Sequence, residues 1–326
     1  MATKLTGKQL TKVSKKDLAE AIDDGNGAFF SPDGKRLIKF TNKNLTKYAV
    51  NEGTEIIADE AFLCMKNLKE ITIPNTVTYI GKSAFVSLRS IKKIVLPDSV
   101  KYLGEMAFMD CISLKEIVLP DTLTHIGGMA FDSCRSLKKV TIPKRLKTLE
   151  SAAFSGCLQI EIASNSKRFI IKNDFLIDNK NKAPLYYFGK DKKVVMPKGI
   201  TRIDWPVFIG SQVEEITVSD SVTTLGYRAF NDCPELQKVI LPATITEIVG
   251  VTFTMCKSLK EVCVPKQCKE AYLKMIYESL AVTPHIIAFK IPQMALSILK
   301  PTEFSIPESY MSKILTVKYW ELLVEI

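Results

Sequence analysis

Cysteine is the residue of this 326-residue chain that is best suited to chemistry, because a thiolate can bind zinc, form a disulfide or attack a substrate. Five of the eight cysteines share one position, three residues after a phenylalanine: Cys111, Cys134, Cys157, Cys233 and Cys256. Met65, Leu88 and Ser211 occupy the same position elsewhere, so neither bridging nor metal binding is required there. We predict a packing position for reduced thiols. If neighbouring positions stack about 5 Å apart, disulfides between them are not sterically excluded.

Neither a metal site nor a cofactor site is predicted. The chain has no CxxC pair and only two histidines, His125 and His285, which argues against zinc. His125 takes a position that Tyr79, Tyr102 and Thr148 hold in other copies of the repeat described below, so we interpret it as a surface residue of that repeat. The chain contains no phosphate-binding GxxxxGK[ST] loop and no GxSxG nucleophile motif. We therefore predict that the protein is not an enzyme and has no cofactor.

An internal repeat of 23 residues must position these side chains. An Ala-Phe pair marks most copies. The phenylalanines are 23 residues apart from Phe62 to Phe154, and after a longer interval the pattern resumes at Phe208: Phe62, Phe85, Phe108, Phe131, Phe154, Phe208, Phe230 and Phe253. Self-similarity at this period predicts a solenoid, in which each copy packs only on its neighbours. The repeated phenylalanines are therefore expected to form the core.

Each copy also has a predicted turn and a predicted strand. Apolar residues lie eight and five positions before the phenylalanine, and glycine follows the second of them in four copies, where a tight turn is expected: Gly81, Gly104, Gly127 and Gly226. A further apolar residue follows the phenylalanine by six positions and leads into a short strand, for example 71–73 or 117–119. Proline closes most of these strands, because it cannot donate a hydrogen bond to a neighbouring strand.

Three rows of side chains are expected to run across the predicted strands. The first row consists of weakly polar, β-branched residues that point outward between two inward apolar residues, and Cys263 is a further outward position. This row is our predicted binding site: Thr72, Val95, Val118, Thr141, Thr217 and Ile240. The second alternates in charge, which predicts ion pairs between neighbouring copies: Glu70, Lys93, Glu116, Lys139, Glu215, Lys238 and Glu261. The third row is basic and lies at the start of the strands: Lys69, Lys92, Lys115, Lys138 and Lys260.

The repeat resembles the leucine-rich repeats of the BspA type. The resemblance rests on the pattern I-G-x-x-A-F-x-x-C-x-S-L-K-x-I-x-L-P, which is clearest at 103–120 and 126–143. It implies an α/β leucine-rich-repeat solenoid that is curved and right-handed, with a parallel sheet on the concave face and a mostly irregular convex side. It also implies a family often found on microbial surfaces, in adhesion and in binding of host proteins.

We predict three segments. Residues 1–52 comprise a helix from Lys15 to Ile22, started by Ser14 and Asp17, and a capping hairpin over 29–40. Residues 53–266 form the solenoid of eight repeats, with a hairpin insertion at about 164–196 that pairs 175–177 with 185–188. The clustered aromatics at 186–188 are interpreted either as part of a tolerated loop or as a contact surface. Residues 267–326 form a C-terminal cap and tail, with a helix at 267–276.

Composition limits the setting in which the protein works. No run of residues is long and apolar enough for a membrane span, and the N-terminus has no apolar core of a signal peptide. The sequence as given therefore indicates a cytoplasmic protein, or a cell-surface or secreted one from which a leader has been removed. The net charge of +10 is interpreted as solubilising, because no recognition motif for nucleic acid is present.

The function predicted from these features is a non-catalytic binding module. The concave face would mediate protein–protein or adhesion-type interaction with a protein or glycan ligand, and the protein is expected to be a monomer. The alternative is an intracellular structural scaffold whose partner docks on the C-terminal tail at 283–326.

Overall fold

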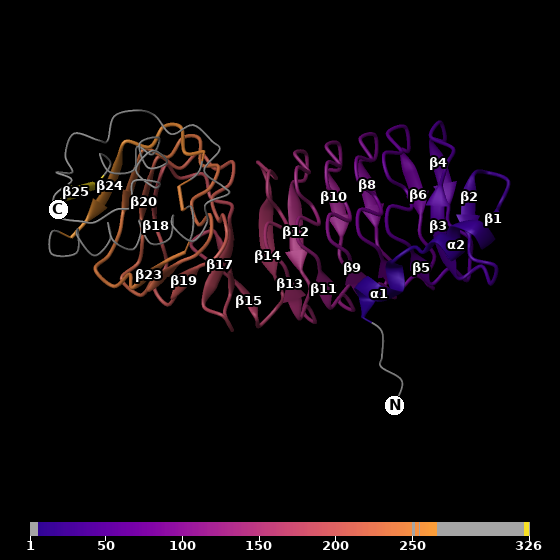
Figure 1. Ribbon diagram of the computed structural model, residues 1–326, viewed down its shortest axis with the longest axis horizontal. Helices are drawn as coiled ribbons and strands as arrows, with labels where there is room; N and C mark the ends of the chain where they lie inside the picture. The colour runs from indigo at the N-terminus through magenta and orange to yellow at the C-terminus, as the bar shows by residue number, and fades with distance from the viewer. Residues whose placement is uncertain (1–5, 250–251, 254, 266–322, 326) are drawn as a thin grey trace, which may run out of the picture. The chain divides into compact units, whose positions relative to one another are not determined.

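The computed structural model describes residues 6–249, 252–253, 255–265 and 323–325. These residues belong to two compact units, the first made of residues up to 181 together with 185–188, and the second made of 182–184 and the residues from 189 onward. Within each unit, the repeats contribute short strands and longer strands, which pair in parallel with the corresponding strands of neighbouring repeats (Figure 1).

In unit 1 the short strands pair in register from one copy to the next. This short-strand sheet contains β5 (Ile56–Ile57), β7 (Tyr79–Ile80), β9 (Tyr102–Leu103), β11 (His125–Ile126) and β13 (Thr148–Leu149). The longer strands form the sheets that carry the predicted outward rows: β4 (Lys47–Ala49) pairs with β6 (Glu70–Thr72), and β8 (Lys93–Val95), β10 (Glu116–Val118), β12 (Lys139–Ile142) and β14 (Glu161–Ser164) follow one another. The solenoid is confirmed, but its repeat has a second strand that the sequence analysis did not predict.

The repeated phenylalanines form the core, as predicted. Phe85, Phe108 and Phe131 are fully buried, and their rings stack on the rings of the neighbouring copies. Ring centroids of consecutive phenylalanines from Phe62 to Phe154 lie 5.2, 5.0, 5.5 and 5.5 Å apart, with interplanar angles of 19° or less. Stacking at the spacing of a parallel sheet buries each ring between two others, which is why the residue recurs with the period.

The N-terminal segment closes one end of unit 1. It contains α1 (Gly7–Thr11), α2 (Lys15–Glu20), β1 (Ile22–Asp23), β2 (Ala28–Phe30) and β3 (Arg36–Phe40). The predicted helix and hairpin are confirmed, whereas α1 was not predicted. Strand β3 pairs in parallel with β5, and Phe40 stacks on Phe62 at 5.3 Å. The cap therefore continues both the sheet and the aromatic core by one further layer.

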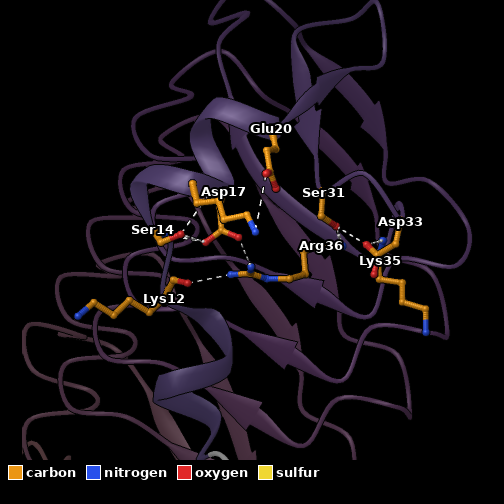
Figure 2. A network of polar contacts seen from close by, with 9 residues as sticks. Lys12, Ser14, Asp17, Glu20, Ser31, Asp33, Lys35 and Arg36 are labelled. Atoms are coloured by element: carbon orange, nitrogen blue, oxygen red, sulfur yellow. Dashed lines mark hydrogen bonds and ion pairs between the residues drawn. The ribbon is translucent and has the colours of Figure 1, made fainter.

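A polar network fastens this segment to the hairpin (Figure 2). The Asp17 carboxylate accepts a hydrogen bond from the backbone N–H of Ser14, and the Asp17 N–H donates to Ser14 Oγ, which together form the capping box of α2. The Arg36 guanidinium of β3 donates to Asp17 Oδ1 at 2.7 Å and to the carbonyl oxygen of Lys12 at 2.8 Å. The hydrogen bond from Ser14 and the charge of Arg36 lower the pKa of Asp17. The guanidinium of Arg36 therefore connects the end of α1 and the first turn of α2 to strand β3.

The insertion after Phe154 adds an antiparallel sheet of β15 (Phe169–Lys172), β16 (Phe175–Asp178) and β17 (Ala183–Tyr187). The predicted pair of strands is confirmed as β16 and β17, and β15 is an additional strand. The interpretation of 186–188 as a contact surface was wrong, because Tyr186 and Tyr187 are buried. Tyr186 lies 6.5 Å from the ring of Phe154, so its aromatic side chain extends the core instead of facing solvent.

Unit 2 repeats the two-sheet plan. Its longer strands are β18 (Lys193–Val195), β20 (Glu215–Thr217), β22 (Lys238–Ile240), β24 (Glu261–Val264) and β25 (Leu323–Glu325), and its short strands are β19 (Arg202–Ile203), β21 (Thr224–Leu225) and β23 (Glu247–Ile248). Phe208, Phe230 and Phe253 stack in its core. The C-terminal strand β25 pairs in parallel with β24, whereas the predicted helix at 267–276 lies outside the described residues. Within the described ranges, α-helix occurs only in α1 and α2.

Candidate binding face

The predicted outward row of unit 1 lies on one face of the longer-strand sheets. Val95 and Val118 are 55% and 47% exposed and face each other across the pair β8–β10 in register. Thr72 is exposed and Thr141 is half-buried. Ala49 pairs with Thr72, and Ala163 pairs with Thr141, so the row is longer at both ends than the sequence analysis predicted. We call these six residues, from Ala49 to Ala163, the aliphatic row.

The corresponding row of unit 2 differs from the predicted row at both ends. Val195 pairs with Thr217 and is 67% exposed, although the sequence analysis did not include it. Ile240 is half-buried. The prediction that Cys263 points outward was wrong, because its side chain is 1% exposed. Its strand, β24, is followed in the sheet by β25, from a part of the chain that has no repeat and whose place could not be inferred from the period.

The row of alternating charge forms ion pairs at some of the predicted positions: Lys93–Glu116 and Lys238–Glu261 are paired, whereas Lys139 has no ion pair among the described residues. In unit 1, the lysine ammonium lies 2.9 Å from the carboxylate in both Lys47–Glu70 and Lys93–Glu116. In unit 2, the corresponding distances are 3.2 Å for Lys193–Glu215 and 3.1 Å for Lys238–Glu261. Exposed pairs of this kind contribute at most about 1 kcal/mol each, so their main effect is to neutralise the row.

The cysteine column lies on the inside of the solenoid. Cys111, Cys134 and Cys157 are buried, and each thiol donates a 3.1 Å hydrogen bond to the carbonyl oxygen of a phenylalanine in a neighbouring copy. Burial raises the pKa of Cys157 to about 12. Cys233 is also buried, and Cys256 is half-buried. All seven cysteines in the described part of the chain are free thiols, in agreement with the prediction.

We expect these thiols to react in two classes. Burial blocks access to the sulfur of Cys111, Cys134, Cys157 and Cys233, so these thiols should react slowly with a disulfide reagent in the native protein. For Cys134, Cys157 and Cys233, a raised pKa also leaves little thiolate at pH 8. Cys64 is exposed and should react fast. The measurement compares thiol counts of native and denatured protein, with Cys64→Ser as the control that removes one fast equivalent. Rapid modification of every thiol in the native state would contradict the burial.

His125 belongs to an aromatic ladder on the short-strand sheet. Its ring stacks on that of Tyr102 with centroids 4.4 Å apart, and its Nε2 lies 3.6 Å from Glu150 Oε1. Burial lowers the pKa of His125, and the charge of Glu150 opposes this. The other side of the ladder is covered by α1, because Gly7 leaves no room for a Cβ atom beside the Tyr102 ring. His125 is thus half-buried instead of being a free surface residue, and its ring and carboxylate contacts are structural.

Metal-binding clusters and membrane-spanning helices are both absent from the residues that the structure describes. No group of three or more His, Cys, Asp or Glu side chains among them could hold a metal ion. No helix in this part of the chain is long and apolar enough to cross a membrane.

Comparison with protein families identifies the repeat. The model of the BspA-type leucine-rich-repeat region matches residues 38–161 and 183–305 in six copies, which is well over half of the chain. The chain belongs to the BspA-type leucine-rich-repeat family. Leucine-rich repeats of this family form protein-binding modules. A search of curated proteins finds no match.

Solved structures share the fold of this BspA-type protein. A leucine-rich cell-surface protein of Faecalibacterium prausnitzii is 19% identical, with 75% of this chain and 88% of that chain covered and a TM-score of 0.55. A leucine-rich-repeat protein of Eubacterium ventriosum is 18% identical, covering 73% and 76%, with a TM-score of 0.52. The pneumococcal vaccine antigen PcpA is 17% identical, covering 78% and 77%, also with a TM-score of 0.52. At these identities, the likeness extends to the fold alone.

Proposed function

We propose that this BspA-type protein is a non-catalytic module that binds a protein ligand through the aliphatic row and the strand face around it. The observation that carries the proposal is the exposed pair Val95 and Val118 on adjacent strands. Apolar side chains that remain contiguous and exposed on a regular sheet suit a binding surface, because burying them against a partner is favourable. Thr72, Thr141, Thr217 and Ile240 extend the proposed face within their own sheets.

The absence of a catalytic assembly in the described residues is consistent with a binding role. The buried thiols face the core, and His125 is occupied by Tyr102 and Glu150. Leucine-rich-repeat proteins of this kind are generally non-enzymatic. The charged row is neutralised by its own ion pairs, so contact with a partner would rely on the aliphatic row and on charges outside the paired row.

Charge introduced into the aliphatic row should abolish binding. Val95→Glu combined with Val118→Glu would place two carboxylates at the centre of the contact, while the fold should persist because both side chains point outward. The measurement is quantitative mass spectrometry of proteins captured from native lysate by wild-type and variant protein, with circular dichroism as the check on folding. Asn51→Glu with Asn75→Glu, at exposed positions between the longer and the short strands, is the matched control. If a folded row variant captured the same proteins as the control, the site would not lie on this face, and the tail at 283–326 would be tested next by deletion.

A further inference from the structure

Four lysines lie at the start of consecutive longer strands, separated from the aliphatic row by the row that contains Lys93 and Glu116. Lys69, Lys92, Lys115 and Lys138 occupy the same position in consecutive copies, directly before β6, β8, β10 and β12, and all four are exposed. Their backbones are in register, since Lys115 N–H donates to the carbonyl of Lys92 at 2.8 Å and Lys138 N–H donates to that of Lys115 at 3.3 Å. Neighbouring ammonium groups are therefore attached about 5 Å apart along the sheet. We call these four residues the lysine row.

The lysine row carries charge that the protein does not neutralise. In the adjacent row, Lys47 and Lys93 each have a glutamate partner within 2.9 Å. By contrast, none of the four lysines makes an ion pair with any residue that the structure describes. Like charges at neighbouring positions of a sheet are destabilising, so unit 1 keeps an arrangement that weakens its own folding.

Unit 2 provides an internal comparison, because the fold does not require lysine at this position. The backbone hydrogen bonds that define the position recur there, from Glu214 to Lys192, from Gln237 to Glu214 and from Lys260 to Gln237. The side chains, however, do not form a row of like charges: Lys192 lies 2.6 Å from the carboxylate of Glu214, and the neutral Gln237, whose amide oxygen accepts a 3.4 Å hydrogen bond from Lys260, separates that lysine from the pair. The uncompensated row is thus a property of unit 1 alone and not of the repeat.

We infer that the lysine row of unit 1 binds an acidic, amphipathic helix of a protein partner. The inference rests on the binding function proposed above and specifies the chemistry of its ligand. Val95 and Val118 follow Lys92 and Lys115 by three residues, about 10 Å along the chain, and are exposed, with the ion pair of Lys93 and Glu116 between the two rows. A helix is about 10 Å wide, so one that lies over this pair would direct carboxylates at the lysines from one flank and apolar side chains at the valines from the other. The rows contain no aromatic side chain on which the bases of a nucleic acid could stack, which favours protein over single-stranded nucleic acid.

The spacing favours a helix over an extended segment. Side chains on one face of a helix, three or four residues apart, lie about 5–6 Å from one another, close to the separation of the lysines. Alternate side chains of an extended strand lie about 6.8 Å apart and would lose register with the row after two copies. A helix that lies along the solenoid axis can therefore present one carboxylate to each of the four lysines, within the reach of their flexible side chains.

The test uses a synthetic helical peptide as the probe, with glutamate at one side of an apolar leucine stripe, and a scrambled peptide of the same composition. Wild-type protein should bind the helical peptide more tightly than the scrambled one, with affinity that falls as salt rises. Lys92→Glu combined with Lys115→Glu should weaken binding by about tenfold or more, because carboxylates would then oppose carboxylates. Lys101→Glu with Lys147→Glu makes the same change of net charge at exposed positions outside the row and should leave affinity within about twofold of wild type.

Several results would overturn the inference. These are no binding of the helical peptide, equal loss in the two double variants, or preferential binding of heparin or oligo-dT that the row variant alone loses. Capture of proteins from native lysate by the two double variants distinguishes failure of this inference from failure of the proposed function. If the Val95/Val118 variant loses its captured proteins and the folded Lys92/Lys115 variant keeps them, the binding face stands and the acidic partner is refuted. If neither variant loses them, both proposals fail.

Discussion

Phe131→Ala is expected to lower the free energy of unfolding by about 3–5 kcal/mol, the cost of truncating a large aromatic residue in a core. The side chain is fully buried, and its ring stacks at 5.5 Å on Phe108 on one side and on Phe154 on the other. Truncation would remove both contacts and leave a cavity between two copies, whose backbones are held at the sheet spacing and cannot close the gap. The measurement is denaturant unfolding followed by circular dichroism.

Leu158→Ala is the matched control for this experiment. Leu158 belongs to the same unit, but its side chain is 60% exposed, so its truncation should change stability by no more than about 0.5 kcal/mol. A midpoint for Phe131→Ala that equals the midpoint of the control would show that the aromatic column does not hold the solenoid together.

Gly104→Ala is expected to destabilise unit 1 by about 3 kcal/mol or more, at the upper end of the cost of overpacking. An added Cβ atom would lie 2.5 Å from the carbonyl carbon of Gly81 and 2.5 Å from the backbone nitrogen of Lys82. Both atoms belong to the backbone of the preceding copy, so no side chain can rotate away to relieve the clash. The two copies would have to separate, which would stretch the parallel hydrogen bonds between β7 and β9.

Gly128→Ala tests whether this effect is specific. A Cβ atom on Gly128 would lie 3.4 Å from its nearest neighbour, the carbonyl oxygen of Ser151, which is an ordinary contact. We expect a change within about 1 kcal/mol, measured in the same unfolding experiment. Equal destabilisation by the two alanines would contradict the close approach of backbones at the first position. A midpoint for Gly104→Ala close to that of wild type would contradict it as well.

The charge of the proposed binding surface depends on which lysines have partners in the neighbouring copy, and the two units differ in this respect. The sequence pattern predicts a basic row at the start of the strands but does not reveal which lysines have partners. The ion pair of Lys192 with Glu214 in unit 2, and the unpaired Lys92 and Lys115 in unit 1, distinguish a neutral row from a charged one. This distinction depends on side chains of neighbouring copies, which are 22 or 23 residues apart in the chain.

The sequence by itself determined the features that recur with the period. The solenoid, the phenylalanine core, the buried thiols and some of the paired charges were predicted, because each copy meets the same neighbours as the copy before it. A residue type that recurs every 23 positions therefore indicates whether its position is buried or exposed. Val95 and Val118 were correctly predicted to be exposed for this reason.

Only the tertiary structure decided what happens where the period stops. Tyr186 extends the aromatic core, Gly7 packs on Tyr102, and Cys263 is buried in a sheet that continues with β25. Each of these outcomes depends on one non-repeating segment that folds back onto the repeats. Such contacts join residues far apart in the chain and occur once, so no periodic signal marks them, and their packing is resolved only when the whole chain is folded.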